Sequence, residues 1–195
     1  MMETEVRIKI PKERIGVLIG KQGKVKRLIE KETKTKIEVD SETGEVTIKA
    51  TPETNDPILV LKARDIVKAI GRGFSPERAM WLLDEDKMLD IINLKEYVGS
   101  SKRALIRVKG RIIGRDGRTR KIIEETTDTL ISVYGHTVAI IGSYEGLRVA
   151  REAIEMLLRG ARHATVYRFL ERERLRLKKA QVELWEKPGE TGEPP

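Results

Sequence analysis

Two short glycine-containing stretches are the residues of this chain best suited to binding a ligand. They read Ile19-Gly20-Lys21-Gln22-Gly23-Lys24 and Ile113-Gly114-Arg115-Asp116-Gly117-Arg118. In each stretch, two glycines three positions apart allow a tight turn whose backbone N–H groups face outward at the start of a helix. Such a turn binds anions, and a Cβ at either glycine would stand between the chain and a phosphate backbone. We therefore predict two phosphate-binding loops.

Charged side chains gather around both loops. The candidate binding residues are Gly20, Lys21, Gln22, Gly23, Lys24, Lys26 and Arg27 in the first stretch, and Gly114, Arg115, Asp116, Gly117, Arg118, Arg120 and Lys121 in the second. Between Lys102 and Lys121 there are nine basic residues and a single acid, Asp116. We expect this acid to weaken phosphate binding unless the surrounding arginines offset its charge.

The two stretches belong to a longer internal repeat. A shift of 94 positions aligns the glycines of one loop with those of the other, and the match extends beyond them. Further matched pairs are Ile29 with Ile123, Glu30 with Glu124, Thr33 with Thr127, Thr35 with Thr129, Ile37 with Ile131 and Val39 with Val133. The period is longer than that of solenoid repeats, so it indicates two copies of one small domain.

Composition narrows the class of protein. The 195 residues carry a net charge of +8, which suits a polyanionic partner. The absence of cysteine excludes disulfides and cysteine-based metal sites, and it fits a reducing cytoplasm. Since no apolar run approaches the roughly 20 residues that span a bilayer, we predict a cytoplasmic protein without a membrane segment.

The elements that must position the loops follow from periodicity. In the first copy we predict a strand over 6–10, a helix over 12–19, the loop, a helix over 24–33, strands over 36–39 and 46–50, and a helix capped by Asn55 or Asp56. The second copy should contain a strand over 88–94, a helix capped by Ser100 or Ser101, the loop, a helix over 118–127, strands over 129–134 and 137–141, and a helix over 144–158. A further helix is predicted over 166–187.

This order of elements around a GxxG loop resembles the type I KH domain. The resemblance implies an α+β fold of two tandem type I KH domains, each a three-stranded sheet covered by three helices, plus a C-terminal helix. The corresponding segments are a first KH domain over 4–73, an acidic helical link over 74–86, a second KH domain over 87–160, a C-terminal helix over 161–187 and a disordered tail over 188–195.

The resemblance also implies single-stranded RNA as the ligand. In KH domains the GxxG loop grips the backbone of about four unstacked nucleotides, and the bases lie in an apolar groove. By position, 20–23 and 114–117 would be the clamps, and the phosphate contacts would come from Lys21, Lys24, Lys26, Arg115, Arg118 and Arg120. Lys26 and Arg120 depart from the family, since many KH domains have an aliphatic residue there.

The acidic link, the run 142–147 and the later pair Val166-Tyr167 are similar to the archaeal homologues of the eukaryotic partner-of-Nob ribosome assembly factor. That resemblance implies binding to the 3′ end region of small-subunit (16S) rRNA, or its precursor, during maturation. It also implies a Nob-type endonuclease and a translation initiation factor as partners. In the eukaryotic branch the first copy has lost its GxxG, whereas here both copies keep it.

Other binding chemistries fit the sequence less well. A nucleotide-binding P-loop needs four residues between its glycines and a Ser or Thr after the lysine, but Gly16 and Gly20 enclose three residues and Gln22 follows Lys21. The adjacent acids of 84–86 are expected on a solvated helix end rather than around a metal ion. No aromatic residue lies in a loop or its flanking helices, which disfavours base stacking.

Catalysis is not expected either. His136 and His163 have no nucleophile or metal partner in motif spacing, so each is expected to face solvent or cap a helix. We predict no enzyme activity and no cofactor. Two other functions stay open: a protein-interaction scaffold that binds through the acidic link or the C-terminal helix, and a KH accessory of an RNA-decay or translation-regulating complex.

Overall fold

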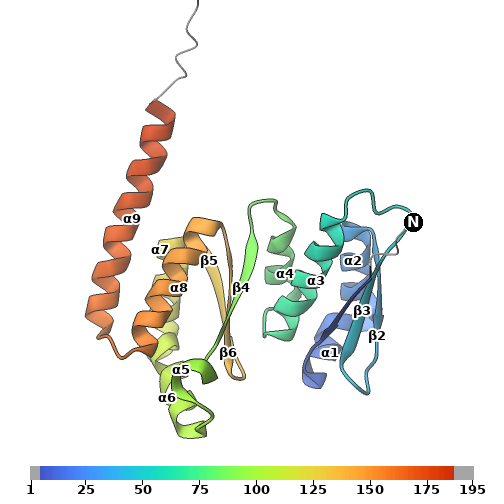
Figure 1. The fold of residues 1–195 in the computed structure, drawn as a ribbon, viewed down its shortest axis with the longest axis horizontal. Coiled ribbons are helices and arrows are strands. Elements are labelled where there is room, and N and C mark those ends of the chain that lie inside the picture. Colours follow the sequence, from blue (N-terminus) through green and yellow to red (C-terminus); the bar gives the residue numbers. More distant parts are fainter. Residues whose placement is uncertain (1–4, 187–195) are drawn as a thin grey trace, which may run out of the picture.

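The chain forms two α+β domains, each with a three-stranded antiparallel sheet (Figure 1). The structure is a computed structural model that describes residues 5–186, apart from the side chains of 180, 181 and 183–186. The first domain consists of β1 (Glu5–Lys9), α1 (Lys12–Ile19), α2 (Lys24–Thr33), β2 (Thr35–Val39), β3 (Glu45–Ala50) and α3 (Ile58–Gly71). The second consists of β4 (Met88–Asn93), α5 (Lys95–Val98), α6 (Lys102–Ile113), α7 (Arg118–Thr127), β5 (Thr129–Tyr134), β6 (Thr137–Gly142) and α8 (Tyr144–Leu158).

The element order confirms the predicted fold class of two KH domains. In each domain the last strand is central, giving the orders β1-β3-β2 and β4-β6-β5. Between the domains lie α4 (Pro76–Ala79) and the 3₁₀ helix η2 (Met80–Leu83), and the chain continues into α9 (His163–Glu186). The short helix α5 is absent from the sequence-based prediction, and α9 starts at His163, between the start of the predicted C-terminal segment at 161 and that of the predicted helix at 166. The tail predicted over 188–195 lies outside the described residues.

The residues that match between the copies make the same contacts. In the first domain the Glu30 carboxylate accepts a hydrogen bond from the Ile37 backbone N–H (2.8 Å), and Glu124 does the same for Ile131 in the second domain (2.7 Å). Each bond fixes the helix after the loop to the neighbouring edge strand. The repeat therefore preserves the contacts that hold the loop-bearing helix in place.

Threonines close the same helix at its other end in both copies. The Thr33 hydroxyl bonds the Ile29 carbonyl oxygen (2.6 Å) and the Thr35 hydroxyl (2.8 Å). The matched Thr127 bonds Ile123 (2.7 Å) and Thr129 (2.8 Å) in the same way. These buried hydroxyls satisfy each other and the helix end, which explains why threonine recurs there.

The outer face of the second sheet is covered by the helices of the first domain. Figure 1 shows β4, β5 and β6 between α7 and α8 on one side and α3 and α4 on the other. Apolar side chains of this face pack in the same cluster as the first domain's core, namely Leu89, Ile91, Leu130, Ala139 and Ile141. The two domains are therefore joined through a shared core.

Polar contacts border this interface. The Ser132 hydroxyl donates to the Arg72 carbonyl oxygen (2.9 Å), and the Tyr134 hydroxyl donates to the Glu13 carboxylate (2.7 Å). The bond from Tyr134 is the main reason why the pKa of Glu13 is lowered. From the link, Arg78 forms an ion pair with Glu124 of α7 (2.5 Å). These bonds fix the orientation of the two domains.

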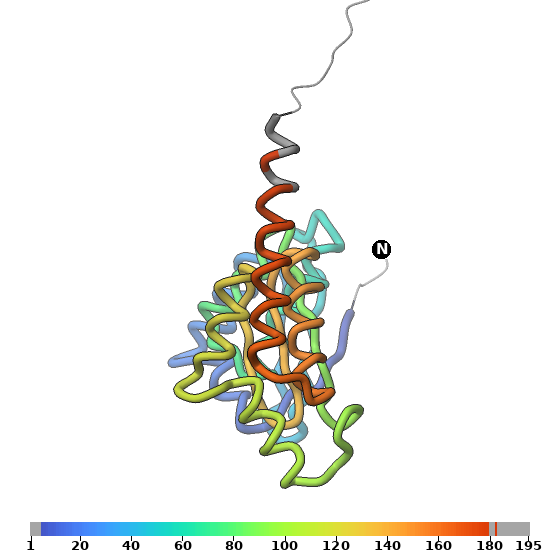
Figure 2. Tube along the Cα trace, turned by 90° about the vertical axis from the view of Figure 1, so that its left-hand side faces the viewer, coloured from blue at the N-terminus to red at the C-terminus, as the bar shows by residue number. Residues whose placement is uncertain are grey.

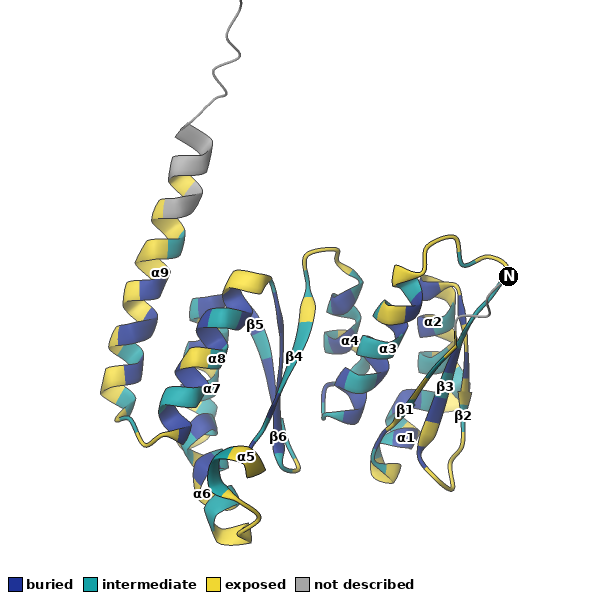
Figure 3. Cartoon of the chain, viewed as in Figure 1, coloured by how far each residue is buried: buried dark blue, intermediate teal, exposed yellow. Residues whose placement is uncertain are grey.

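The first sheet, by contrast, has a charged outer face. Lys36 lies opposite Lys49 in the first sheet, where Leu130 lies opposite Ile141 in the second. On this face Lys49 forms an ion pair with Glu38 (2.8 Å). Figure 3 shows exposed and half-buried residues along the strands of the first sheet and a mostly buried second sheet. The same strand pattern thus gives a free face in one domain and an interface in the other.

Helix α9 packs on α7 and α8 and extends beyond the second domain (Figures 1 and 2). Its buried side chains, Val166, Phe169 and Leu170, join the second core. Burial opposes ionisation of Glu173, but hydrogen bonds from Arg148 and Arg176 outweigh it and lower the pKa of this carboxyl. Although α9 has 24 residues, no helix within 5–186 is apolar enough over such a length to cross a membrane.

Because the outer face of the second sheet is buried and that of the first is not, we predict that substitutions at corresponding positions of the two central strands, β3 and β6, differ in their effect on stability. Ile141→Lys would bury an unpaired ammonium group between the domains, and we expect it to lower the free energy of unfolding by about 3 kcal/mol or more. Lys49→Ile at the corresponding position of the first sheet should change it by about 0.5 kcal/mol or less. Urea denaturation measures both values, and equal small effects would contradict the shared core.

The contacts of Glu124 generate a second prediction. Glu124→Ala leaves the N–H of the buried Ile131 without its acceptor and Arg78 without its ion pair, so we expect the free energy of unfolding to fall by about 1–3 kcal/mol. The control is Glu125→Ala, because this neighbouring, exposed carboxylate has only a 3.8 Å ion pair with Lys121 and should contribute about 0.5 kcal/mol or less. Denaturation midpoints that shift equally in both variants would exclude the proposed role of Glu124.

Candidate nucleic-acid interface

The two GxxG loops have the same backbone conformation. Each is a single 3₁₀ turn between two helices: η1 (Lys21–Gly23) between α1 and α2, and η3 (Arg115–Gly117) between α6 and α7. All four glycines have positive φ angles, with Gly20 at 70° and Gly114 at 76°, and Gly23 at 74° and Gly117 at 73°. Since this region favours glycine, the spacing in the sequence is a direct consequence of the turn.

The two glycines of each loop are required for different reasons. An added Cβ at Gly20 would overlap with Val25, and one at Gly114 would overlap with Thr119. At Gly23 and Gly117 the nearest atoms belong to arginine side chains, 3.2 Å and 3.9 Å away. The expectation that a Cβ at either glycine would obstruct a ligand stays a prediction, and the structure adds a second requirement at the first glycine. The first glycine allows the loop to pack on its own helix.

The middle position of each loop is also left-handed although it is not glycine. Gln22 and Asp116 both have φ 54° and ψ 29°, and both side chains are exposed. Aspartate tolerates this conformation better than most residues. In the first loop Arg27 donates to the Gln22 carbonyl oxygen (2.6 Å), whereas its counterpart Lys121 pairs with Glu125. Arg27 thus supports the loop itself.

The predicted phosphate contacts fall into two groups. Lys21, Lys24, Arg115 and Arg118 are exposed, and no carboxylate within the described residues forms an ion pair with them. Lys26 instead pairs with Glu30 (3.4 Å), and Arg120 is half-buried with its Nε buried and without a hydrogen-bond partner in the described chain. The first group is the one available for a ligand.

Asp116 is not neutralised by the arginines beside it. Its exposed carboxylate forms no ion pair of 4.0 Å or less with any described residue. It therefore adds a negative charge to the second loop only, because Gln22 occupies the same place in the first. The two loops share one backbone shape but differ in charge.

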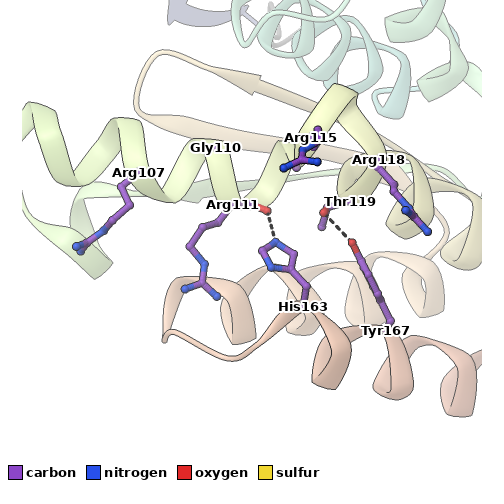
Figure 4. A pocket seen from close by; sticks show the side chains of 9 residues that line it. Arg107, Gly110, Arg111, Arg115, Arg118, Thr119, His163 and Tyr167 are labelled. Carbon is purple, nitrogen blue, oxygen red and sulfur yellow. Dashed lines mark hydrogen bonds between the residues drawn. The ribbon is translucent and has the colours of Figure 1, made fainter.

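Helix α9 brings two rings to the second loop, which the sequence reasoning missed. The Tyr167 and Thr119 hydroxyls form a hydrogen bond (2.9 Å), and His163 Nε2 bonds the Arg111 carbonyl oxygen (3.0 Å) (Figure 4). His163 is thus half-buried and caps the C-terminal end of α6, as one of the two roles expected for it, because the Arg111 carbonyl lies in the last turn of that helix. The missed signal is the spacing of Val166, Phe169, Leu170 and Leu177, which marks one helix face toward the domain.

The remaining candidates lie away from the loops. The acids of 84–86 are exposed before β4, and the described residues include no group of three His, Asp or Glu side chains that could hold a metal ion. Burial, followed by Lys95 and Arg72, lowers the pKa of His136 in the turn between β5 and β6. Trp81 packs against the first core and carries Lys87 over its ring at 4.7 Å.

Comparison with known proteins assigns both halves of the chain to KH domains. The family model of the eukaryotic type KH domain (KH-domain type I) matches residues 88–175. The model of the Krr1 KH1 domain matches residues 5–85. The two matches together cover both GxxG loops.

Proteins that match most of the chain support the same assignment. A KH domain-containing protein of Methanocaldococcus jannaschii is 52% identical over 95% of this chain and 81% of its own length. The crystal structure of Dim2p from Pyrococcus horikoshii is 61% identical, with a TM-score of 0.83 over 87% of this chain and 99% of that chain. The same organism's a/eIF2alpha-aDim2p-rRNA complex contains a chain that is 59% identical, with a TM-score of 0.85 over 89% and 96%.

A third structure, of a protein from Aeropyrum pernix, is 45% identical, with a TM-score of 0.92 over 96% of this chain and 100% of that chain. These relatives share the arrangement of two domains as well as the fold of each. The chain therefore belongs to the family of archaeal tandem type I KH-domain proteins that includes Dim2p.

Proposed function

We propose that the protein binds single-stranded RNA through both GxxG loops. The observation that carries this proposal is the pair of loops with one backbone conformation, each flanked by exposed cations that pair with no carboxylate of residues 5–186 whose side chain is described. Four such cations, Lys21, Lys24, Arg115 and Arg118, stand where a nucleic-acid backbone would pass a KH clamp. Positive side chains near phosphates release counterions on binding, which favours association at low salt.

Each loop would hold about four nucleotides whose bases are unstacked. The outward N–H groups and the basic side chains fix the phosphates and carry no base information, so base preference has to come from the groove beside each loop. Because both clamps belong to one rigid two-domain body, one RNA strand that reaches both would gain affinity from the second contact.

The comparisons support an rRNA as the ligand. The relative that is 59% identical to this chain was solved with rRNA, and the second half of this chain matches the model of a type I KH domain. We infer that this protein binds the 3′ end region of small-subunit rRNA, or its precursor, during ribosome assembly in the cytoplasm. It would act by holding the RNA, without an enzyme activity of its own.

Protein partners follow from the same comparison. The solved complex also contains a/eIF2alpha, so we infer that a translation initiation factor binds this protein. A Nob-type endonuclease is a further proposed partner, since a clamp near the 3′ end would present the cleavage region. Pull-downs from nuclease-treated extract test both, because partners that vanish with the RNA would not be direct ones.

The clamps predict a specific loss of RNA binding. Gln22→Asp combined with Arg115→Asp places new carboxylates in both loops, and Gln22→Asp should be tolerated because Asp116 has the same dihedral angles. We expect the affinity for single-stranded rRNA fragments to fall at least tenfold, or by about 1.4 kcal/mol. Fluorescence anisotropy at fixed salt measures the change, and a thermal melt checks folding.

The control carries the same change in net charge elsewhere. Lys34→Asp introduces the aspartate that the second copy has at position 128 and lowers the net charge by two. Asn55→Asp lowers it by one more at an exposed site. This control double variant should retain most of the wild-type affinity for RNA. Equal affinities of the folded loop variant and the wild type would overturn the two-clamp proposal, and crosslinking in extract would then identify which RNA, if any, is bound.

A further inference from the structure

A basic pocket lies beside the second GxxG loop, on the side where α9 begins. It has a volume of about 490 Å³ and is lined by α6, the loop, the start of α7 and the start of α9. The lining residues that matter here are Arg107, Arg111, Arg115, Arg118, His163 and Tyr167. Figure 4 shows Arg111, Arg115 and Arg118 around the two rings of α9, with Arg107 farther along α6. The pocket thus includes two loop residues and two arginines that are not part of the clamp.

The pocket is built for an anion. No acidic residue lines it, and within the described chain none of its four arginines forms an ion pair with a carboxylate. Arg111 donates to the Ala161 carbonyl oxygen, and its Nε is buried without a hydrogen-bond partner. A buried donor without an acceptor is costly, and four uncompensated guanidinium groups around one cavity repel each other. A bound anion would relieve both.

The first copy serves as an internal comparison, because it has the same loop without this pocket chemistry. Glu13 stands at the place of Arg107, Val17 at that of Arg111 and Val25 at that of Thr119. Glu13 accepts the hydrogen bond from Tyr134 across the domain interface. A KH fold with a GxxG loop therefore does not require the two arginines, and their presence in the second copy calls for a different reason.

We propose that this pocket holds a phosphodiester group of the RNA strand, adjacent to the nucleotides gripped by the second GxxG loop. The inference rests on the proposed RNA-binding function and adds a contact outside the clamp. Arg115 and Arg118 border both the clamp and the pocket, so a strand that leaves the loop on this side meets Arg107 and Arg111 next. Planar guanidinium groups suit phosphate oxygens because they donate in pairs.

Helix α9 completes the site. His163 and Tyr167 form its wall opposite α6, held there by the bonds to Arg111 and Thr119. Tyr167 is half-buried, and its hydroxyl forms a hydrogen bond with that of Thr119. In the proposed complex, the ribose next to the phosphate would lie against this ring. The C-terminal helix thereby becomes part of the RNA-binding surface, and the site exists in the second domain alone.

The test removes Arg107, which is exposed, lies outside the clamp and forms no ion pair with a described carboxylate. Arg107→Gln is compared with Lys102→Gln, which removes the same charge from an exposed residue of the same helix that does not line the pocket. All proteins also carry Lys21→Asp and Lys24→Asp, which reverse both exposed cations of the first loop, so that the second clamp dominates binding. Affinities are measured for a tetranucleotide that fills one clamp and for a 12-nucleotide RNA of the same core sequence, at several salt concentrations.

We expect Arg107→Gln to weaken binding of the 12-nucleotide RNA by about three- to tenfold and to leave the tetranucleotide unchanged. The slope of log K against log salt for the longer RNA should fall by about 0.7, the value for one phosphate contact on a single strand. Arg107→Glu, which copies the first domain's Glu13, should weaken it further. Lys102→Gln should change neither the affinity for the two RNAs nor the slope of log K against log salt.

Other outcomes separate the two proposals. If Arg107→Gln and Lys102→Gln weaken both RNAs equally, the effect is general electrostatics and the pocket assignment is wrong. Unchanged binding of the long RNA by both Arg107 variants would also overturn it, while leaving the clamp intact. The proposed function itself is wrong if neither RNA binds to the wild type or to the background variant, which carries only the substitutions in the first loop.

Discussion

Burial of the second sheet's outer face against the helices of the first domain is the constraint on which the rest of the structure depends. Leu130 and Ile141 belong to the cluster that also contains the first domain's core. A single core that crosses the domain boundary cannot open without exposing apolar surface on both sides. The two GxxG loops are therefore held in one rigid body, which gives their relative position a functional meaning.

The two domains pack head to tail, since the sheet of one meets the helices of the other (Figure 1). Such a contact does not close on itself and would continue into further copies if the free ends were apolar. One end is the first sheet, whose outer face carries Lys36 and an ion pair between Lys49 and Glu38. The other end is covered by α9. Charge and an extra helix thus stop the stack at two domains.

Duplication has preserved the backbone and let the chemistry diverge. The dihedral angles of the loops coincide, as do the bonds of Glu30 and Glu124 to the following strand. The charges around the loops do not coincide, because Asp116 and Arg107 stand where the first copy has Gln22 and Glu13. A fold that fixes the clamp by glycine geometry leaves the neighbouring positions free to adapt to different parts of a ligand.

The local elements and the repeat could be predicted from the sequence by itself, because they depend on short-range physics. Glycine spacing set the two turns, apolar periodicity set the helices and strands, and the matched Glu30 and Glu124 pointed to one fold used twice. The family resemblance then supplied the three-stranded sheet that each domain contains. Strand β6 also carried a signal of the interface, since its residues 138–141 are apolar on both faces.

The tertiary structure alone decided which surfaces meet. The ion pair of Lys26 with Glu30 and the close approach of Val25 to Gly20 both depend on where side chains lie in space. A one-dimensional pattern does not contain these positions. His163 and Tyr167 are about 50 residues from the second loop in sequence, yet α9 places them beside it. The sequence determined the elements because their contacts are local, and only packing of distant segments determined the site.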